Sequence, residues 1–307
     1  SHLAHLVLII QDVISAFGHP TPPEIITQAP FDLDSSHYER LCQTNDLPAP
    51  FDIGCYIDDI TYQDTLQPDL FLFLFPVCLR VWQFNLMQAH QSDYRGYMES
   101  FSGALAKHAG YKKQLTPSQY DAVNLFMRNV ILDKIDQEVD LSIKRCRGVS
   151  PYDWIGAIVT YGTVYQNLSK LWENWWRVTS KGRAIAMLKY VSGLMYAENE
   201  NPLFTPWTRG KGGGPPALWN SDGHVYFQSW HQENLVYLRK TLTVDYLRTS
   251  ITNAASLLEG EIDSTVPSKM VLDINNGDTQ ARAALRVEEL LEYLSQDVGG
   301  HYSWKTQ

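Results

Sequence analysis

The chain has 307 residues, enough for two domains of roughly 150 residues each or for one large domain. Hydrophobic residues make up 44% and charged residues 19% of the chain, a composition that excludes a disordered or collagen-like protein. The formal net charge of −9 argues against nucleic acid or an anionic membrane as a ligand and leaves basic proteins as expected partners.

The first predicted element is an amphipathic helix over residues 3–17, because its apolar side chains recur at helical spacing and Gly18 ends it. Residues 20–67 contain frequent prolines and scattered acidic residues, which predict loops with short helical turns. Residues 68–87 are densely apolar. They predict a buried helix that is kinked or restarted at Pro76, and a hydrophobic strand is the alternative.

Two helix-start signals lie in the middle of the chain. Thr116-Pro117-Ser118-Gln119 is a capping box with proline at the first helical position, and it predicts a helix from Pro117 to about Val139. Ser150 and Pro151 repeat this pattern and predict one helix that carries several aromatic residues, among them Trp154, Trp172, Trp175 and Trp176.

The short basic segment 144–148 separates these two helices and is the expected domain boundary. We therefore expect an N-terminal helical domain over residues 1–147. A C-terminal helical domain over residues 148–307 would follow, with a loop rich in glycine and proline and a hairpin.

The C-terminal part begins with a helix that Ser180 caps and that ends near Ala197. Residues 199–216 have the composition of a long loop, and the turn sequence at 220–223 between apolar residues predicts a small β-hairpin. Two further helices are predicted over residues 229–258 and 278–296. The expected fold class is mainly α, a multi-helix globular protein with one small β-hairpin.

Two segments imitate ligand-binding motifs but lack necessary residues. Residues 209–214 offer glycines and Lys211 for a phosphate, yet no Ser or Thr follows the lysine and two prolines stand where a helix would start. Residues 273–278 resemble a calcium loop, but Ala284 occupies the position of the bidentate carboxylate. We expect no cofactor and no metal, and a turn and cap at 273–278.

Histidines near the hairpin are the candidate catalytic residues. His224 and His231 flank its exit, and Asp222 lies close to them in sequence. A folded hairpin would bring imidazole and carboxylate together for proton transfer or metal binding. Surface histidines that bond to water are the alternative.

Acidic residues are the candidate partner-binding residues. Asp58, Asp59 and Asp64 belong to a sparse acidic series that would face a basic partner, although solvated carboxylates and helix caps account for such a series equally well. The tryptophans at 172, 175 and 176 share one helix face and either line a cleft or pack in the core, of which core packing is the commoner.

The cysteines indicate a cytoplasmic protein. Cys42, Cys55, Cys78 and Cys146 form no Cys-x-x-Cys pair, so neither a structural zinc site nor a disulfide framework is predicted. No membrane span is expected, because the apolar run 70–79 is shorter than the roughly 20 residues that a bilayer requires.

Residues 1 to about 135 resemble a small bacterial domain family of unknown function. The matching stretches are the opening helix that ends at Ala16-Phe17, the segment 66–79 with its Leu-Phe-Pro core, and Leu115 to Gln119. This resemblance implies a bacterial, cytoplasmic origin, and the family has no established catalytic residues to carry over to this chain.

Two functional hypotheses remain. The first is a non-catalytic binding protein, most concretely an immunity-type antagonist that occludes a basic partner such as a toxin domain. The second is a hydrolase or transferase with a site under the 199–216 loop near His224 and His231. The sequence leaves open whether the protein is an enzyme and what its oligomeric state is.

Overall fold

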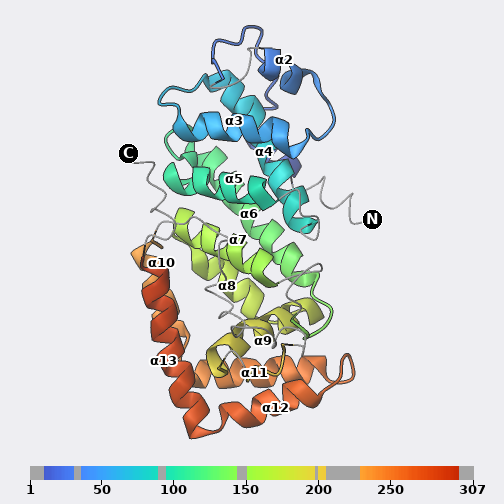
Figure 1. Ribbon diagram of the computed structural model, residues 1–307, viewed down its shortest axis with the longest axis vertical. Coiled ribbons are helices and arrows are strands. Elements are labelled where there is room, and N and C mark those ends of the chain that lie inside the picture. The colour runs from blue at the N-terminus through green and yellow to red at the C-terminus, as the bar shows by residue number, and fades with distance from the viewer. Residues whose placement is uncertain are drawn as a thin grey trace, which may run out of the picture. The chain divides into compact units, whose positions relative to one another are not determined.

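A computed structural model describes residues 10–30, 36–88, 95–143, 151–197, 200–204 and 229–296 of the chain (Figure 1). The described residues are mainly helical, as expected. The chain divides into two compact units, Ser1–Val130 and Ile131–Gln307. This division falls inside α6 (Pro117–Asp136), whereas the expected boundary segment, 144–148, lies outside the described residues.

The first unit consists of the end of the opening helix, which is described from Ile10, followed by short and long helices. These are α2 (Ser36–Gln43), α3 (Pro50–Tyr62), α4 (Pro68–Met87), α5 (Arg95–Lys107), the short 3₁₀ helix η2 (Ala109–Tyr111) and the first part of α6. The opening helix ends as predicted, because Gly18 takes a φ of 75°, a left-handed conformation that glycine adopts without steric cost.

Helix α3 corrects the expectation of loops over residues 20–67. It has 13 residues and begins with Pro50 in its first turn, a position that needs no amide hydrogen. Its apolar side chains at 53, 56, 57 and 60 follow helical spacing and are buried. The helix was missed because the flanking prolines and the aspartates on α3 obscured this pattern.

Helix α4 confirms the predicted buried helix and excludes the strand. It runs through Pro76 without interruption and packs in the core of the first unit. Among the described residues, α4 is the one helix long and apolar enough to cross a membrane, and 72% of its most apolar stretch is buried. The ten-residue apolar run 70–79 lies inside this 20-residue helix, so the helix is long enough to span although the run alone is not, and the absence of a membrane span stays a prediction. The burial of α4 is typical of the core helix of a soluble protein.

The predicted capping box opens α6. The Gln119 amide nitrogen donates to Thr116 Oγ1 at 3.2 Å, and the Thr116 amide nitrogen donates to Gln119 Oε1 at 3.0 Å. These two bonds satisfy amides that have no partner within the helix. The helix ends at Asp136, close to the predicted end.

Within the described residues, the second unit holds the end of α6 and seven further helices. They are α7 (Pro151–Val164), α8 (Leu168–Trp176), α9 (Lys181–Met195), α10 (Gln232–Thr241), α11 (Val244–Leu258), α12 (Thr265–Ile274) and α13 (Gly277–Leu294). Helix α9 contacts α11, and α13 contacts both α9 and α10 (Figure 1). The helices that Ser180 and Asn276 cap were predicted, and both caps are present: each side-chain oxygen accepts amides of the first turn.

Two helices that were predicted as continuous are each divided in two. The break between α7 and α8 is held by the buried side chain of Asn234, which lies on α10. Its amide nitrogen donates to the carbonyl oxygens of Gly162 and Tyr165, and its oxygen accepts from the Leu168 amide. The second break lies at 242–243, where Thr243 caps α11.

The tryptophans of α8 lie in the core of the second unit, which confirms core packing as their role. Trp172, Trp175 and Trp176 are buried and surround Tyr190 of α9 at centroid distances of 5.5–6.3 Å. The predicted hairpin and the 205–216 part of the predicted loop lie outside the described residues. In the described part of the chain, extended pairing is limited to an isolated parallel bridge between Ile143 and Phe204.

Candidate functional site

The predicted catalytic residues are described only in part, because His224 and Asp222 lie outside the described residues. His231 directly precedes α10 and is partly buried. Its Nε2 lies 3.3 Å from the carbonyl oxygen of Val164 at the end of α7. This contact ties two helices together, and the enzyme hypothesis stays a prediction. Within the described ranges, no group of three or more His, Cys, Asp or Glu side chains is arranged to hold a metal ion.

The three predicted partner-binding aspartates differ in exposure. Asp58 and Asp64 are exposed, whereas Asp59 is 3% exposed and its Oδ2 accepts a hydrogen bond from the Tyr38 hydroxyl. Burial, followed by the hydrogen bond to Asp59, raises the pKa of Tyr38. Asp59 therefore fastens α2 to α3 and is not available to a partner on the folded surface. For Asp58 and Asp64, partner binding remains a prediction.

Negative charge is concentrated at the start of the chain. Residues 1–69 contain eleven acidic residues and one basic residue, Arg40, for a formal charge of −10, so the other residues together carry +1. The net charge of the whole chain conceals this concentration of acidic residues, which becomes evident when the charge of residues 1–69 is counted separately. Eight of these carboxylates are described as exposed: Asp12, Glu24, Glu39, Asp46, Asp52, Asp58, Asp64 and Asp69.

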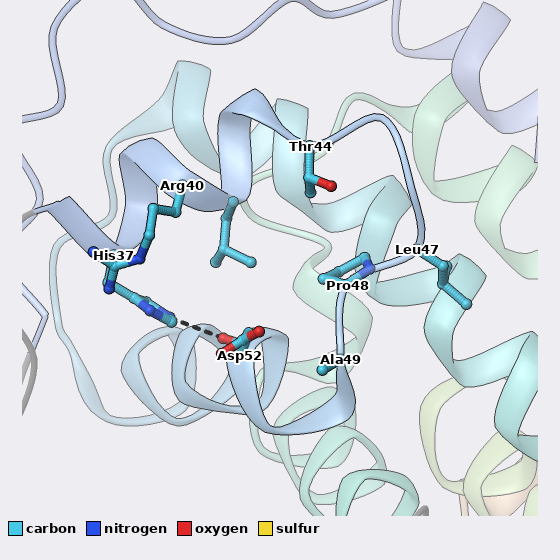
Figure 2. Close-up of a pocket in the computed structure, with 8 residues that line it drawn as sticks. His37, Arg40, Thr44, Leu47, Pro48, Ala49 and Asp52 are labelled. Atoms are coloured by element: carbon cyan, nitrogen blue, oxygen red, sulfur yellow. Dashed lines mark hydrogen bonds between the residues drawn. The ribbon is translucent and has the colours of Figure 1, made fainter.

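A hollow of about 260 Å³ lies between α2 and the start of α3 (Figure 2). Its lining comprises His37, Arg40, Leu41, Thr44, Leu47, Pro48, Ala49 and Asp52. Figure 2 shows the imidazole of His37 directed from α2 at the backbone of Asp52, where Nε2 lies 2.9 Å from the carbonyl oxygen. Because a carbonyl only accepts, this nitrogen carries the proton. The buried histidine thus holds α2 on α3, and Arg40 donates to Ser36 Oγ at 2.6 Å.

A charged cluster is buried in the second unit. Lys189 Nζ pairs with Glu138 Oε2, and Glu138 Oε1 accepts from Trp154 Nε1 at 2.8 Å. Lys134 is also buried. Burial lowers its pKa, and the carboxylates of Asp153 and Glu138 oppose this shift. Such a cluster occurs both in functional sites and in structural ion networks. Here Glu138 compensates the charge of Lys189 within the interior, as a structural network does.

Comparison of the chain with protein-family models, with curated proteins and with solved structures finds no match. The resemblance of residues 1–135 to a bacterial domain family stays a prediction. The exposed carboxylates within residues 1–69 are therefore the described feature that best supports a function.

Proposed function

We propose that this is a non-catalytic binding protein that recognises a basic protein partner through its acidic segment, residues 1–69. The observation that supports the proposal is the segregation of charge, with a formal charge of −10 in this segment against −9 for the entire chain. An immunity-type antagonist that occludes a toxin domain, in the bacterial cytoplasm, is the most concrete form of this function.

The physical effect of such a surface is on the rate of association. A field of one sign steers an oppositely charged partner and raises the association rate constant, more than it raises affinity. The effect declines with salt, because the screening length is about 10 Å at 0.1 M ionic strength. A specific basic partner should therefore bind quickly at low salt and slowly at high salt.

The experiment is affinity capture with the full chain from a lysate of the source cells. Retained protein is eluted with a salt gradient, identified by mass spectrometry and purified. An equimolar basic protein that salt releases would support the proposal. Its absence would overturn the proposal and shift attention to enzyme assays around His224 and His231.

A charge-matched pair of variants then tests the acidic segment itself. The test variant carries Glu24→Gln, Asp46→Asn and Asp64→Asn, three carboxylates that are exposed in the first unit. The control carries Glu259→Gln, Glu261→Gln and Glu292→Gln, which are exposed in the second unit. The test variant should lose about tenfold in association rate constant at low salt and the control much less. Equal losses would contradict recognition by the acidic segment.

A further inference from the structure

The outward face of α3 carries two exposed aromatic side chains. Phe51 is 75% exposed and Tyr62 is 66% exposed, one near each end of the helix. Positions 51, 55, 58 and 62 are spaced by four, three and four residues, so they share one face. On this face the partly buried Cys55 and the exposed Asp58 lie between the two rings. We call these four residues the α3 face.

Two exposed rings at this spacing are suited to bind a partner. Eleven residues of helix separate their positions by about 16 Å, so both can enter one interface of ordinary size. Aromatic side chains are enriched among the residues that carry most binding energy, because they bury a large area with few rotatable bonds. In the described structure no ring contact covers Phe51, whereas Tyr62 is contacted by Lys107.

The charges beside these rings indicate the chemistry of the partner. Asp58 lies within the α3 face, and Asp52 and Asp64 follow Phe51 and Tyr62 closely in the chain. Lys107 Nζ lies 4.5 Å from the centroid of the Tyr62 ring. This cation–π contact is the kind of interaction that a lysine or arginine of a partner would make with Phe51. A second copy of the chain is disfavoured as occupant, because its own acidic segment would be repelled.

We infer that the α3 face is the docking surface for a basic protein segment, with Phe51 and Tyr62 as its apolar anchors. This inference rests on the proposed function and adds the surface through which it acts. Lysine or arginine side chains of the partner pair with Asp52 and Asp58, and its apolar side chains cover the two rings.

The test uses a library of random twelve-residue peptides displayed on phage and selected on the immobilised full chain. Selected peptides should combine Lys or Arg with apolar residues. The binding constant of a synthetic selected peptide is then measured with Phe51→Ala, Tyr62→Ala and the control Leu272→Ala. Leu272 lies on α12 and is 73% exposed, so it matches Phe51 in exposure. Each aromatic variant should weaken binding at least tenfold, and the control should leave it unchanged.

Alkylation of Cys55 by N-ethylmaleimide provides a second readout, independent of mutation. Burial, followed by the charge of Asp58, raises the pKa of Cys55. Labelling is therefore run at about pH 8.5, where more thiolate is present, and is read at each cysteine by mass spectrometry. Saturating peptide should slow the labelling of Cys55 and leave that of Cys42 unchanged.

Several outcomes would overturn the inference. The phage selection could enrich no peptide, or it could enrich peptides without Lys or Arg. All three variants could bind the selected peptide as tightly as the parent chain does, or the peptide could fail to slow the labelling of Cys55. Light scattering could instead detect dimers of the full chain that the Phe51→Ala substitution dissociates. Such dimers would show that a second copy of the chain occupies the α3 face. If the neutralised acidic segment slows association but the aromatic variants do not, the proposed function stands and the α3 face is the wrong surface.

Discussion

Lys189 of α9 pairs with Glu138 inside the second unit, where each side chain is 2% exposed. The other carboxylate oxygen of Glu138 accepts the Trp154 indole N–H, so both oxygens are hydrogen-bonded. A buried ion pair adds little stability compared with apolar residues of equal volume, but the loss of one partner strands a charge. The pair therefore restricts how α9, α7 and the segment after α6 can pack together.

Removal of one member of this pair should destabilise the protein severely. We expect Lys189→Met to lower the free energy of unfolding by about 3–5 kcal/mol, because the buried carboxylate of Glu138 would lose the cation that is hydrogen-bonded to it. The double variant Lys189→Met with Glu138→Gln should recover most of this loss, since the neutral amide oxygen of the introduced glutamine can still accept from Trp154. Urea unfolding monitored by tryptophan fluorescence measures both. The exposed pair of Arg239 and Glu288 is the control, and Arg239→Met should cost less than about 1 kcal/mol.

Gly162 of α7 is a position that admits no side chain. A Cβ atom there would lie 2.4–2.6 Å from ring atoms of Trp230, which is itself buried. Gly162→Ala should therefore destabilise the protein by about 1–3 kcal/mol through overpacking. Gly103→Ala in α5 is the matched control, because the Cβ atom of the introduced alanine would meet no atom within 4 Å. This substitution should stabilise the helix by about 0.5–1 kcal/mol. Differential scanning calorimetry distinguishes the two, and a shift of the same sign in both would contradict the argument.

Asp273 should make stability depend on pH in the acidic range. Its Oδ2 accepts hydrogen bonds from Tyr196 at 2.7 Å and from Lys269 at 2.6 Å. Burial would raise its pKa, but the hydrogen bonds from Lys269 and Tyr196 outweigh burial and lower it. A carboxyl group with a lower pKa in the folded state stabilises that state above its ordinary pKa, and this contribution is lost as pH falls through the folded pKa.

The variant Asp273→Asn should accordingly be less stable than the parent protein at pH 7, by up to about 1 kcal/mol. The difference should shrink as the pH falls below about 4, where the parent carboxyl group also becomes neutral. Urea midpoints measured from pH 7 to pH 3 give this comparison. Glu259→Gln at the exposed end of α11 is the control. A difference that stays constant with pH would show that the charge of Asp273 is not what stabilises the fold.

The helix starts that the sequence predicted depend on residues close together in the chain. The capping box at Thr116 and Gln119, and the caps at Ser180 and Asn276, are complete within four residues. Such signals act before the chain folds and can be read without tertiary information. This explains why the starts of α6, α9 and α13 were predicted correctly.

The helix breaks depend on contacts between distant residues. Asn234 reaches across more than 60 residues to bond the end of α7 and the start of α8, and the continuous aromatic pattern of these helices conceals the break. The candidate partner-binding residues show the same dependence on distant contacts. Asp58 and Asp59 are neighbours in the sequence, but Asp59 is buried and accepts a hydrogen bond from Tyr38, which lies 21 residues earlier in the chain.

These two adjacent aspartates should respond oppositely to substitution. Asp59→Ala leaves the Tyr38 hydroxyl in the interior without this acceptor, so we expect a loss of about 1–3 kcal/mol in the free energy of unfolding. Asp58→Ala removes an exposed carboxylate and should lower stability less than Asp59→Ala does. It should instead slow association with a basic partner. Urea midpoints and association rates measured on both variants test this division. Equal stability of the two would contradict a structural role for Asp59 and return it to the partner-binding surface.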